Sequence, residues 1–168
     1  MIECKTFYTV GLKPSLRAMR LPYPDSKNDT VFGNTVDIII MGEKDMKLAQ
    51  TLIRRGGPHA KFSRGILVYV EINAPVYWWS ELETYRCGHE RLCSESTMNQ
   101  EGKGLSGEEL SKIKADIPMG RMLKKMDYFS YQCLRAIYLQ RKDHRLPEWH
   151  QFIDWMRTIP YAEELIFC

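Results

Sequence analysis

Long apolar runs are absent from this sequence of 168 residues, and no stretch approaches the roughly 20 apolar residues that span a bilayer. The first five residues, Met1 to Lys5, also lack the basic-then-apolar order of a secretory signal peptide. We therefore expect a cytoplasmic protein that makes no contact with membranes.

Closely spaced cysteines are absent as well. Neither a disulfide framework nor a zinc knuckle fits an odd number of cysteines without a CxxC pair. His144 and His150 are separated by Pro147 and have no further ligand at metal-binding spacing, so we expect no metal. The five cysteines, which we expect to be reduced thiols, are Cys4, Cys87, Cys93, Cys133 and Cys168.

A strong excess of one charge is the third absence. The formal net charge is only +3, from 24 basic and 21 acidic side chains, which is too small for a surface that follows nucleic acid phosphates. Hydrophobic residues make up 44% of the chain and charged residues 27%, as in globular proteins. Without repeats or a linker, residues 1–168 predict a single domain.

Hydrophobic periodicity predicts the elements of the first half. We expect strands at residues 4–10 and 36–41, separated by a loop at residues 14–34 that is rich in proline, aspartate and asparagine. A helix should begin at Glu43 and end before Gly56-Gly57-Pro58.

A buried strand at residues 66–72 should follow this helix, because the run is apolar and rich in β-branched side chains. Pro75 suits the first turn of a next helix, which we expect to reach Tyr85 or Cys87. Further along, the pattern predicts a loop at residues 99–107 and helices at residues 106–116, 128–142 and 147–159.

Residues 85–97 gather side chains that donate hydrogen bonds to anions. Arginine forks match phosphate oxygens and serine hydroxyls add short donors, which favours an anionic ligand. The alternative is a solvated loop in which Arg86 and Glu90 form an ion pair. The donors are Arg86, His89, Arg91, Ser94 and Ser96.

The order of these elements resembles the flavin-dependent thymidylate synthases. In that family, a helix and a glycine-histidine turn precede a buried strand, an Ala-Pro turn and a helix. An Arg-His-Arg-x-x-Ser-x-x-x-x-Ser-x-Arg signature then follows. Here the matching positions are Leu52 to Arg55 with His59, the strand that ends at Ala74-Pro75, and the helix after it. Aligned on Ala74-Pro75, Arg86 and Ser94 match the signature, and the departures from it are Thr84, Tyr85, His89 and Ser96.

The resemblance implies an α+β fold with a mainly antiparallel sheet, in which strand 66–72 is central and the helix after Pro75 packs on it. It implies a nucleotide and flavin core at about residues 43–97 and C-terminal helices at about 128–160. It also implies a homo-oligomer, and short variants of this family are expected from bacteriophages or prophages.

The ligands that the resemblance implies are a dUMP-type pyrimidine nucleotide, FAD, and a folate that donates a one-carbon unit to C5 of the pyrimidine. Arg141 ends a segment similar to the family's leucine-x-arginine helix. The residues that we expect to bind the nucleotide are Arg86, Arg91, Ser94, Ser96 and Arg141. The residues that we expect to contact the flavin are His59 and Tyr85. Glu81 stands where the family has a glutamine beside the pyrimidine, which would change the base that is accepted. His89 stands where the family has a serine, and its imidazole could act as an acid or base near neutral pH, so Glu81 and His89 are the catalytic candidates.

Other readings stay open. The same cleft in a non-catalytic protein would bind or sequester a nucleotide, and a structural subunit would use the scaffold only to oligomerise. His59 also fits an ordinary turn residue. At least two of the aromatic residues Tyr77, Trp78, Trp79 and Tyr85 should belong to the core, and Trp149 and Trp155 fit packing positions better than ligand contacts.

Overall fold

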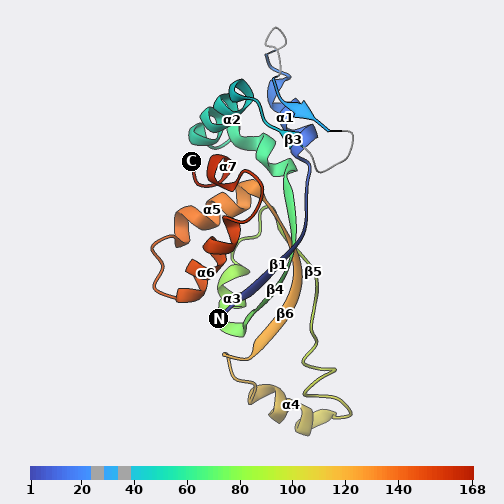
Figure 1. Ribbon diagram of the computed structural model, residues 1–168. Coiled ribbons are helices and arrows are strands. Elements are labelled where there is room, and N and C mark those ends of the chain that lie inside the picture. The colour runs from blue at the N-terminus through green and yellow to red at the C-terminus, as the bar shows by residue number, and fades with distance from the viewer. Residues whose placement is uncertain (24–28, 34–38) are drawn as a thin grey trace.

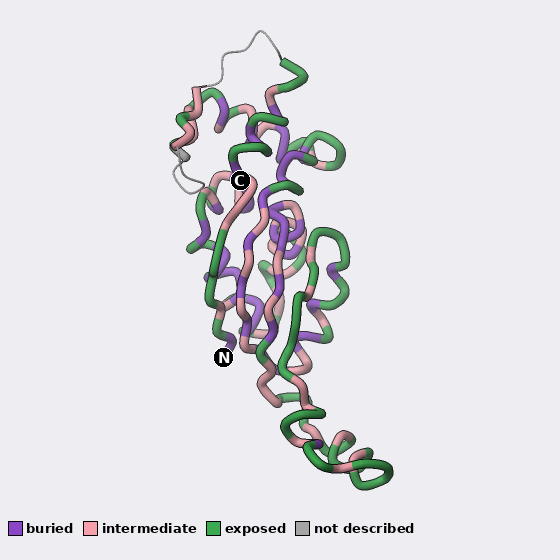
Figure 2. Tube along the Cα trace, turned by 90° about the vertical axis from the view of Figure 1, so that its right-hand side faces the viewer, coloured by how far each residue is buried: buried purple, intermediate pink, exposed green. Residues whose placement is uncertain are grey.

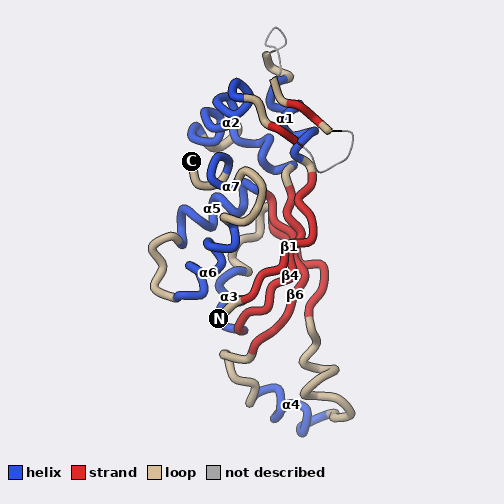
Figure 3. Tube along the Cα trace, in the orientation of Figure 1, coloured by secondary structure: helices blue, strands red, loops and turns tan. Residues whose placement is uncertain are grey.

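A four-stranded antiparallel sheet forms the centre of the protein. The computed structural model describes residues 1–23, 29–33 and 39–168. The strands follow the order β1-β4-β6-β5, and helices lie against one face of the sheet (Figures 1 and 3). Their bounds are Glu3–Val10 (β1), Leu67–Pro75 (β4), His89–Ser94 (β5) and Met122–Ser130 (β6). The predicted mixed fold with an antiparallel sheet and a central strand after residue 66 is therefore confirmed.

The remaining elements surround this sheet. α1 and α2 lie beyond one end of it, and α4 lies beyond the other end (Figure 1). Their bounds are Leu12–Arg20 (α1), Glu43–Arg55 (α2), a 3-10 helix His59–Gly65 (η1), Val76–Leu82 (α3), Gly107–Ala115 (α4), Tyr131–Arg141 (α5), Pro147–Met156 (α6) and Ala162–Leu165 (α7). A separate two-stranded pair consists of Val31–Phe32 (β2) and Ile39–Ile40 (β3). No helix in the described ranges is long and apolar enough to cross a membrane.

Alternation along β4 explains its central place. Val68, Val70, Ile72 and Ala74 are fully buried, whereas the residues between them are half-buried. Figure 2 shows the alternation of buried and intermediate residues along the central strands. This period of two is what a strand covered by helices on one face requires. α3 follows immediately and contacts β4, as predicted.

Aromatic side chains fill the space between the sheet and the helices. Trp78 packs against Trp79, Trp149 and Phe152 with ring centroids 5.0–5.2 Å apart. The apolar stripe of α6 is also buried, including Phe152 and Met156. The prediction that at least two of the aromatic residues at 77–85 belong to the core, together with two tryptophans of the C-terminal helix, is confirmed. The buried residues are Trp78, Trp79, Tyr85, Trp149 and Trp155.

The predicted loop at residues 14–34 was wrong at its start, where α1 occupies Leu12–Arg20. Pro14 lies in the first turn of this helix, where a missing N–H costs nothing. Leu12, Leu16 and Met19 are buried on one stripe, which three prolines nearby had obscured in the sequence. Of the strand predicted at 36–41, residues 36–38 lie outside the described ranges and Ile39–Ile40 form β3.

β6 was missed, and the helix predicted from Tyr128 begins only at Tyr131. The reason is that two inward positions of β6 carry Lys125 and Asp127 instead of apolar residues, which removes the hydrophobic alternation. The predicted loop at 85–97 contains β5, an edge strand with polar side chains, and the helix after Pro75 ends early, at Leu82.

Candidate functional site

A cavity of about 280 Å³ lies beside the start of β5 and the turn that follows α3. Its wall brings together several of the predicted site residues from residues 85–91 with two carboxylates. The lining residues are Glu83, Tyr85, Arg86, His89, Glu90 and Arg91.

The chain enters this site through a glycine that no other residue can replace easily. Gly88 has a φ of 81°, and a Cβ on it would lie 2.2 Å from the Ser130 hydroxyl oxygen. Its carbonyl oxygen accepts a hydrogen bond from the Ser130 backbone N–H. From there, the strand period places His89 and Arg91 on the inner face of β5, opposite Phe129 and Asp127 of β6.

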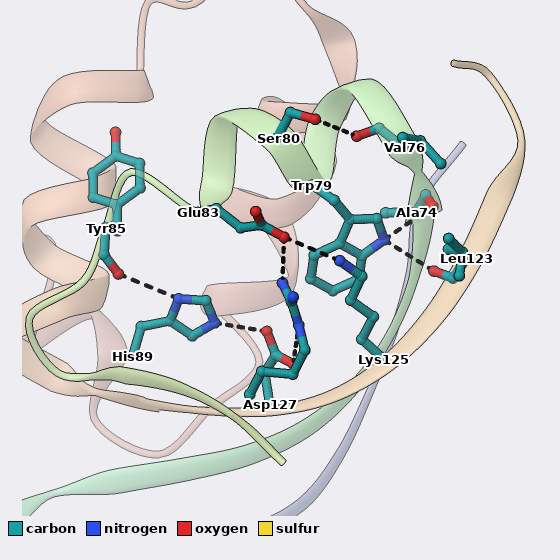
Figure 4. Close-up of polar contacts among 11 residues, drawn as sticks. Ala74, Val76, Trp79, Ser80, Glu83, Tyr85, His89, Leu123, Lys125 and Asp127 are labelled. Atoms are coloured by element: carbon teal, nitrogen blue, oxygen red, sulfur yellow. Dashed lines mark hydrogen bonds and ion pairs between the residues drawn. The ribbon is translucent and has the colours of Figure 1, made fainter. Parts of the chain in front are cut away.

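His89 is held on both sides of its ring (Figure 4). Nδ1 lies 3.2 Å from the Tyr85 carbonyl oxygen and Nε2 lies 2.6 Å from Oδ2 of Asp127. A carbonyl oxygen only accepts, so Nδ1 is the donor of the first hydrogen bond, and Nε2 and Oδ2 form the second. The ring also stacks on Phe129 with centroids 4.4 Å apart. Both nitrogens of this predicted catalytic residue are thus engaged by the protein itself.

Asp127 is fully buried, and the cation Arg91 lies near it in addition to His89. Arg91 Nε lies 3.8 Å from Asp127 Oδ1, too far for a hydrogen bond. Within the described part of the chain, neither of these two buried atoms has a hydrogen-bond partner. Arg91 and Asp127 therefore lie near one another without a hydrogen bond between these two atoms.

Arg91 instead donates to Glu83, at 2.8 Å, and Lys125 donates to the same Glu83 oxygen at 3.3 Å (Figure 4). Burial and the positive charge of Arg91 lower the pKa of Lys125. For Glu83, burial acts to raise the pKa, but the hydrogen bonds from Arg91 and Lys125 outweigh it and the pKa is lowered. Both cations lie over the ring of Trp79.

A second polar cluster lies between α3, α5 and α6. Glu81 Oε2 accepts hydrogen bonds from Arg141 Nη1 and Trp149 Nε1, each at 2.9 Å. Arg141 Nε donates to the Tyr85 hydroxyl at 2.8 Å, and the guanidinium lies 4.5 Å from the Trp149 ring centroid. Three predicted site residues, Glu81, Tyr85 and Arg141, therefore lie together in one cluster. Tyr85 joins the two clusters, because its carbonyl oxygen bonds His89.

The other predicted residues lie elsewhere. Ser94 ends β5 opposite Lys125 and is exposed, and the Ser96 hydroxyl accepts from the Asn99 backbone N–H in the turn beyond. His59 lies on the wall of a separate cavity of about 660 Å³ between α1, α2 and η1. Arg86 is exposed and makes no hydrogen bond or ion pair with the described residues, so the proposed Arg86–Glu90 pair is not formed there.

Sequence reasoning missed Asp127, Lys125 and Glu83. The signal was the pair of charged residues two apart within residues 122–130, because charges that alternate inward in an otherwise apolar strand mark a polar site. Among the described residues, no group of three or more histidine, cysteine or acidic side chains has the arrangement of a metal site.

Comparison with known proteins places this geometry on a recognised scaffold. No protein-family model matches the sequence, and no curated protein matches it. Among solved structures, Thymidylate Synthase X (ThyX) from Helicobacter pylori with FAD and dUMP is 13% identical, with a TM-score of 0.74 over 99% of this chain and 97% of that one. A second structure of this enzyme, complexed with FAD and dUMP, gives a TM-score of 0.72 at 13% identity over 98% and 97% of the two chains.

The UMP/dUMP methylase PolB from Streptomyces cacaoi, bound with 5-Br dUMP, is 14% identical with a TM-score of 0.65 over 98% and 91% of the chains. The protein therefore has the fold of the flavin-dependent thymidylate synthases over nearly its whole length. The resemblance inferred from the sequence is confirmed at the level of the fold.

Proposed function

We propose that the protein binds a pyrimidine deoxynucleotide of the dUMP type at the cavity beside β5. The observation that carries this proposal is the convergence of Arg86 and Arg91 on one cavity. Guanidinium groups bind phosphate by paired hydrogen bonds, and Arg86 is exposed without a competing partner in the described chain. The structural neighbours support the choice of nucleotide, since they were solved with dUMP or 5-Br dUMP.

The second cluster supplies the groups for the base. Arg141 offers further guanidinium N–H groups beside the ring of Trp149, and Glu81 offers a carboxylate oxygen that no described hydrogen bond uses. Paired polar atoms of this kind can form hydrogen bonds with the edge of a nucleobase. Ser94 and Ser96 add hydroxyl groups further along β5.

We propose FAD as the cofactor and the larger cavity as the place that fits its flavin ring. The volume of about 660 Å³ lies within the usual range of ligand cavities, and its wall is mainly apolar, with Met19, Leu52 and Phe62. His59 and Lys61 on the same wall offer polar groups for the ring's edge. When bound, the flavin supplies hydride chemistry, and a folate would donate the one-carbon unit to C5. The residues of the chain would orient and enclose these molecules.

A non-catalytic nucleotide binder is the second candidate function. The observation that favours it is that both predicted catalytic side chains already have internal partners: His89 at both nitrogens, and Glu81 with Arg141 and Trp149. Binding needs only the arginines, whereas catalysis also needs an acid or base that reaches the ligand.

We also propose a homo-oligomer. Tyr8, Tyr69 and Tyr128 are cross-strand neighbours in one row, at positions that alternate with the buried ones on β4 and β6. The described helices lie against the other face of the sheet (Figure 1). An uncovered aromatic row favours association. Size-exclusion chromatography with light scattering tests it, and a monomer at micromolar concentration would contradict it.

One set of measurements separates the two functions. The visible spectrum of the purified protein with and without added FAD reports flavin binding, and calorimetric titration with dUMP reports nucleotide binding. Mass spectrometry of dUMP after incubation with FAD, a reductant and a folate one-carbon donor reports methylation at C5. A methylated product establishes the enzyme, and dUMP binding without flavin or product establishes the binder. If dUMP does not bind, the proposed function is wrong.

A further inference from the structure

Two cations converge on one carboxylate above an aromatic ring. Oε1 of Glu83 accepts from Arg91 Nη2 and Lys125 Nζ at 2.8 and 3.3 Å. The Lys125 ammonium lies 4.4 Å from the centroid of the Trp79 ring, and the Arg91 guanidinium lies 5.7 Å from it. Figure 4 shows Glu83 and Lys125 meeting beside the Trp79 ring, whose N–H is itself bonded to the Ala74 and Leu123 carbonyl oxygens.

Burial distinguishes the cations from the anion. The side chain of Lys125 is 8% exposed and that of Arg91 31%, but that of Glu83 is 51% exposed. A buried lysine beside an arginine is unfavourable unless an anion faces both, and the lowered pKa of Lys125 agrees with this. Asp127 on β6 and Glu83 in the turn after α3 both supply negative charge to this pair, and Glu83 is the one that accepts hydrogen bonds from both cations. Its half-exposed carboxylate can move away without removing an apolar side chain from the core.

Asp127 is a second anion near Arg91, and Arg91 makes no hydrogen bond to it. Its Nε and Asp127 Oδ1 are both buried, lie 3.8 Å apart and have no hydrogen-bond partner in the described chain. A small shift of Arg91 would bring these atoms within hydrogen-bond distance. Arg91 would therefore remain anchored if Glu83 departed, and its Nη groups would be available to another anion.

We propose that Arg91 and Lys125, above the Trp79 ring, form a binding site for a phosphate monoester, and that Glu83 occupies this site as an internal competitor in the free protein. The cavity of about 280 Å³ borders both Glu83 and Arg91 and provides room for the rest of the ligand. A phosphate dianion offers more charge and more acceptor oxygens than one carboxylate, so it displaces Glu83. That the monoester belongs to a nucleotide rests on the proposed function.

Inorganic phosphate is the probe, with calorimetric titration at low salt. Glu83→Gln removes the competing charge, and we expect it to bind phosphate about tenfold more tightly than the parent protein. Glu90→Gln is the matched control, because Glu90 lines the same cavity and makes no described ion pair. We expect Glu90→Gln to change the affinity by less than about threefold, as for a rim charge. Adding Lys125→Met to Glu83→Gln should abolish the gain, with a thermal melt to show that this double variant is folded.

The inference is wrong if Glu83→Gln binds phosphate no more tightly than Glu90→Gln does, a comparison that does not depend on the Lys125 variant. Titration with dUMP separates this failure from that of the proposed function. Phosphate binding by Glu83→Gln without dUMP binding by any variant supports this site and refutes the nucleotide. Equal dUMP affinity in the parent, Glu83→Gln and Glu90→Gln refutes the competitor role and leaves the proposed function standing.

Discussion

The Nε2 atom of His89 lies 2.6 Å from Oδ2 of Asp127, across the boundary between the edge strand β5 and its neighbour β6. The histidine stacks on Phe129, its direct cross-strand partner, and this contact directs Nε2 at the carboxylate two residues away on β6. A buried polar pair therefore fixes the start of β5. Because Arg86 precedes this point and Arg91 follows it, the pair also fixes where the two arginines meet the cavity.

Removing the Asp127 carboxylate should destabilise the protein strongly. Asp127→Ala leaves the ring of His89 without its buried acceptor and removes the buried negative charge that lies 3.8 Å from Arg91. We expect a loss of about 3–5 kcal/mol in the free energy of unfolding. Asp127→Asn should cost clearly less, because its amide can donate to Nε2 of a neutral His89. Urea unfolding measures both. Equal stabilities of the two variants would show that the hydrogen bond to His89 contributes little.

A hydrogen bond between α3 and α6 should make stability depend on pH. The Tyr77 hydroxyl donates to Oε1 of Glu148 at 2.6 Å, and this bond lowers the pKa of Glu148 in the folded protein. A lowered pKa gives stability that is fully present above the ordinary glutamate value of about 4.3 and is lost as the pH falls through the folded value. Tyr77→Phe should therefore cost about 1.5 kcal/mol at pH 7, and the cost should shrink below about pH 4.

Tyr138→Phe is the control for this prediction, since Tyr138 lies on α5 and its hydroxyl makes no hydrogen bond with the described residues. Urea unfolding of the three proteins between pH 3 and pH 7, roughly the range in which carboxylates titrate, decides the matter. A constant difference between Tyr77→Phe and the parent protein would mean that the Glu148 carboxylate does not depend on the tyrosine.

Much of the fold could be predicted from the sequence because most of its helices and strands show a clear hydrophobic periodicity. α2 begins at Glu43 and ends at Arg55 as expected, and β4 reads as a buried strand. β5 and β6 could not be predicted in this way, because their inner positions hold polar side chains that form hydrogen bonds with one another. Hydrophobic patterning cannot detect a strand whose buried face is a polar network.

The candidate site was predictable only where residues adjoin in sequence. Arg86, His89 and Arg91 meet at one cavity because they lie on one short segment of the chain. Asp127 and Lys125 reach the same place only through the antiparallel pairing of β5 with β6, which no local pattern in the sequence reports. For the same reason, the contact of Glu81 with Arg141, 60 residues apart, could be found only in the structure.

Arg86 offers the most direct test of nucleotide binding. Its side chain is exposed and has no described partner, so Arg86→Ala should leave the melting temperature unchanged. We expect the variant to bind dUMP more weakly by about 1.5–3 kcal/mol, the range for a hydrogen bond to a charged group. Arg55→Ala, an exposed arginine in the last turn of α2, is the control and should bind as the parent does. Unchanged dUMP affinity in Arg86→Ala would exclude Arg86 from the site.

Glu81 should influence which base is accepted. Its carboxylate only accepts hydrogen bonds, whereas a glutamine both accepts and donates. Uracil presents a carbonyl oxygen at position 4, which needs a donor, and cytosine presents an amino group there, which needs an acceptor. Glu81→Gln should therefore raise the affinity for dUMP relative to dCMP by about tenfold, while the carbonyl oxygen of the new amide still accepts from Arg141 and Trp149.

The matched control is Glu90→Gln, which makes the same chemical change on a side chain that does not contact Arg141. Calorimetric titration of the parent and both variants with dUMP and dCMP gives the ratio of the two affinities in each protein. We expect the ratio to change only in Glu81→Gln. An unchanged ratio in a folded Glu81→Gln protein would mean that Glu81 serves only to hold Arg141 and Trp149, and that another residue reads the base.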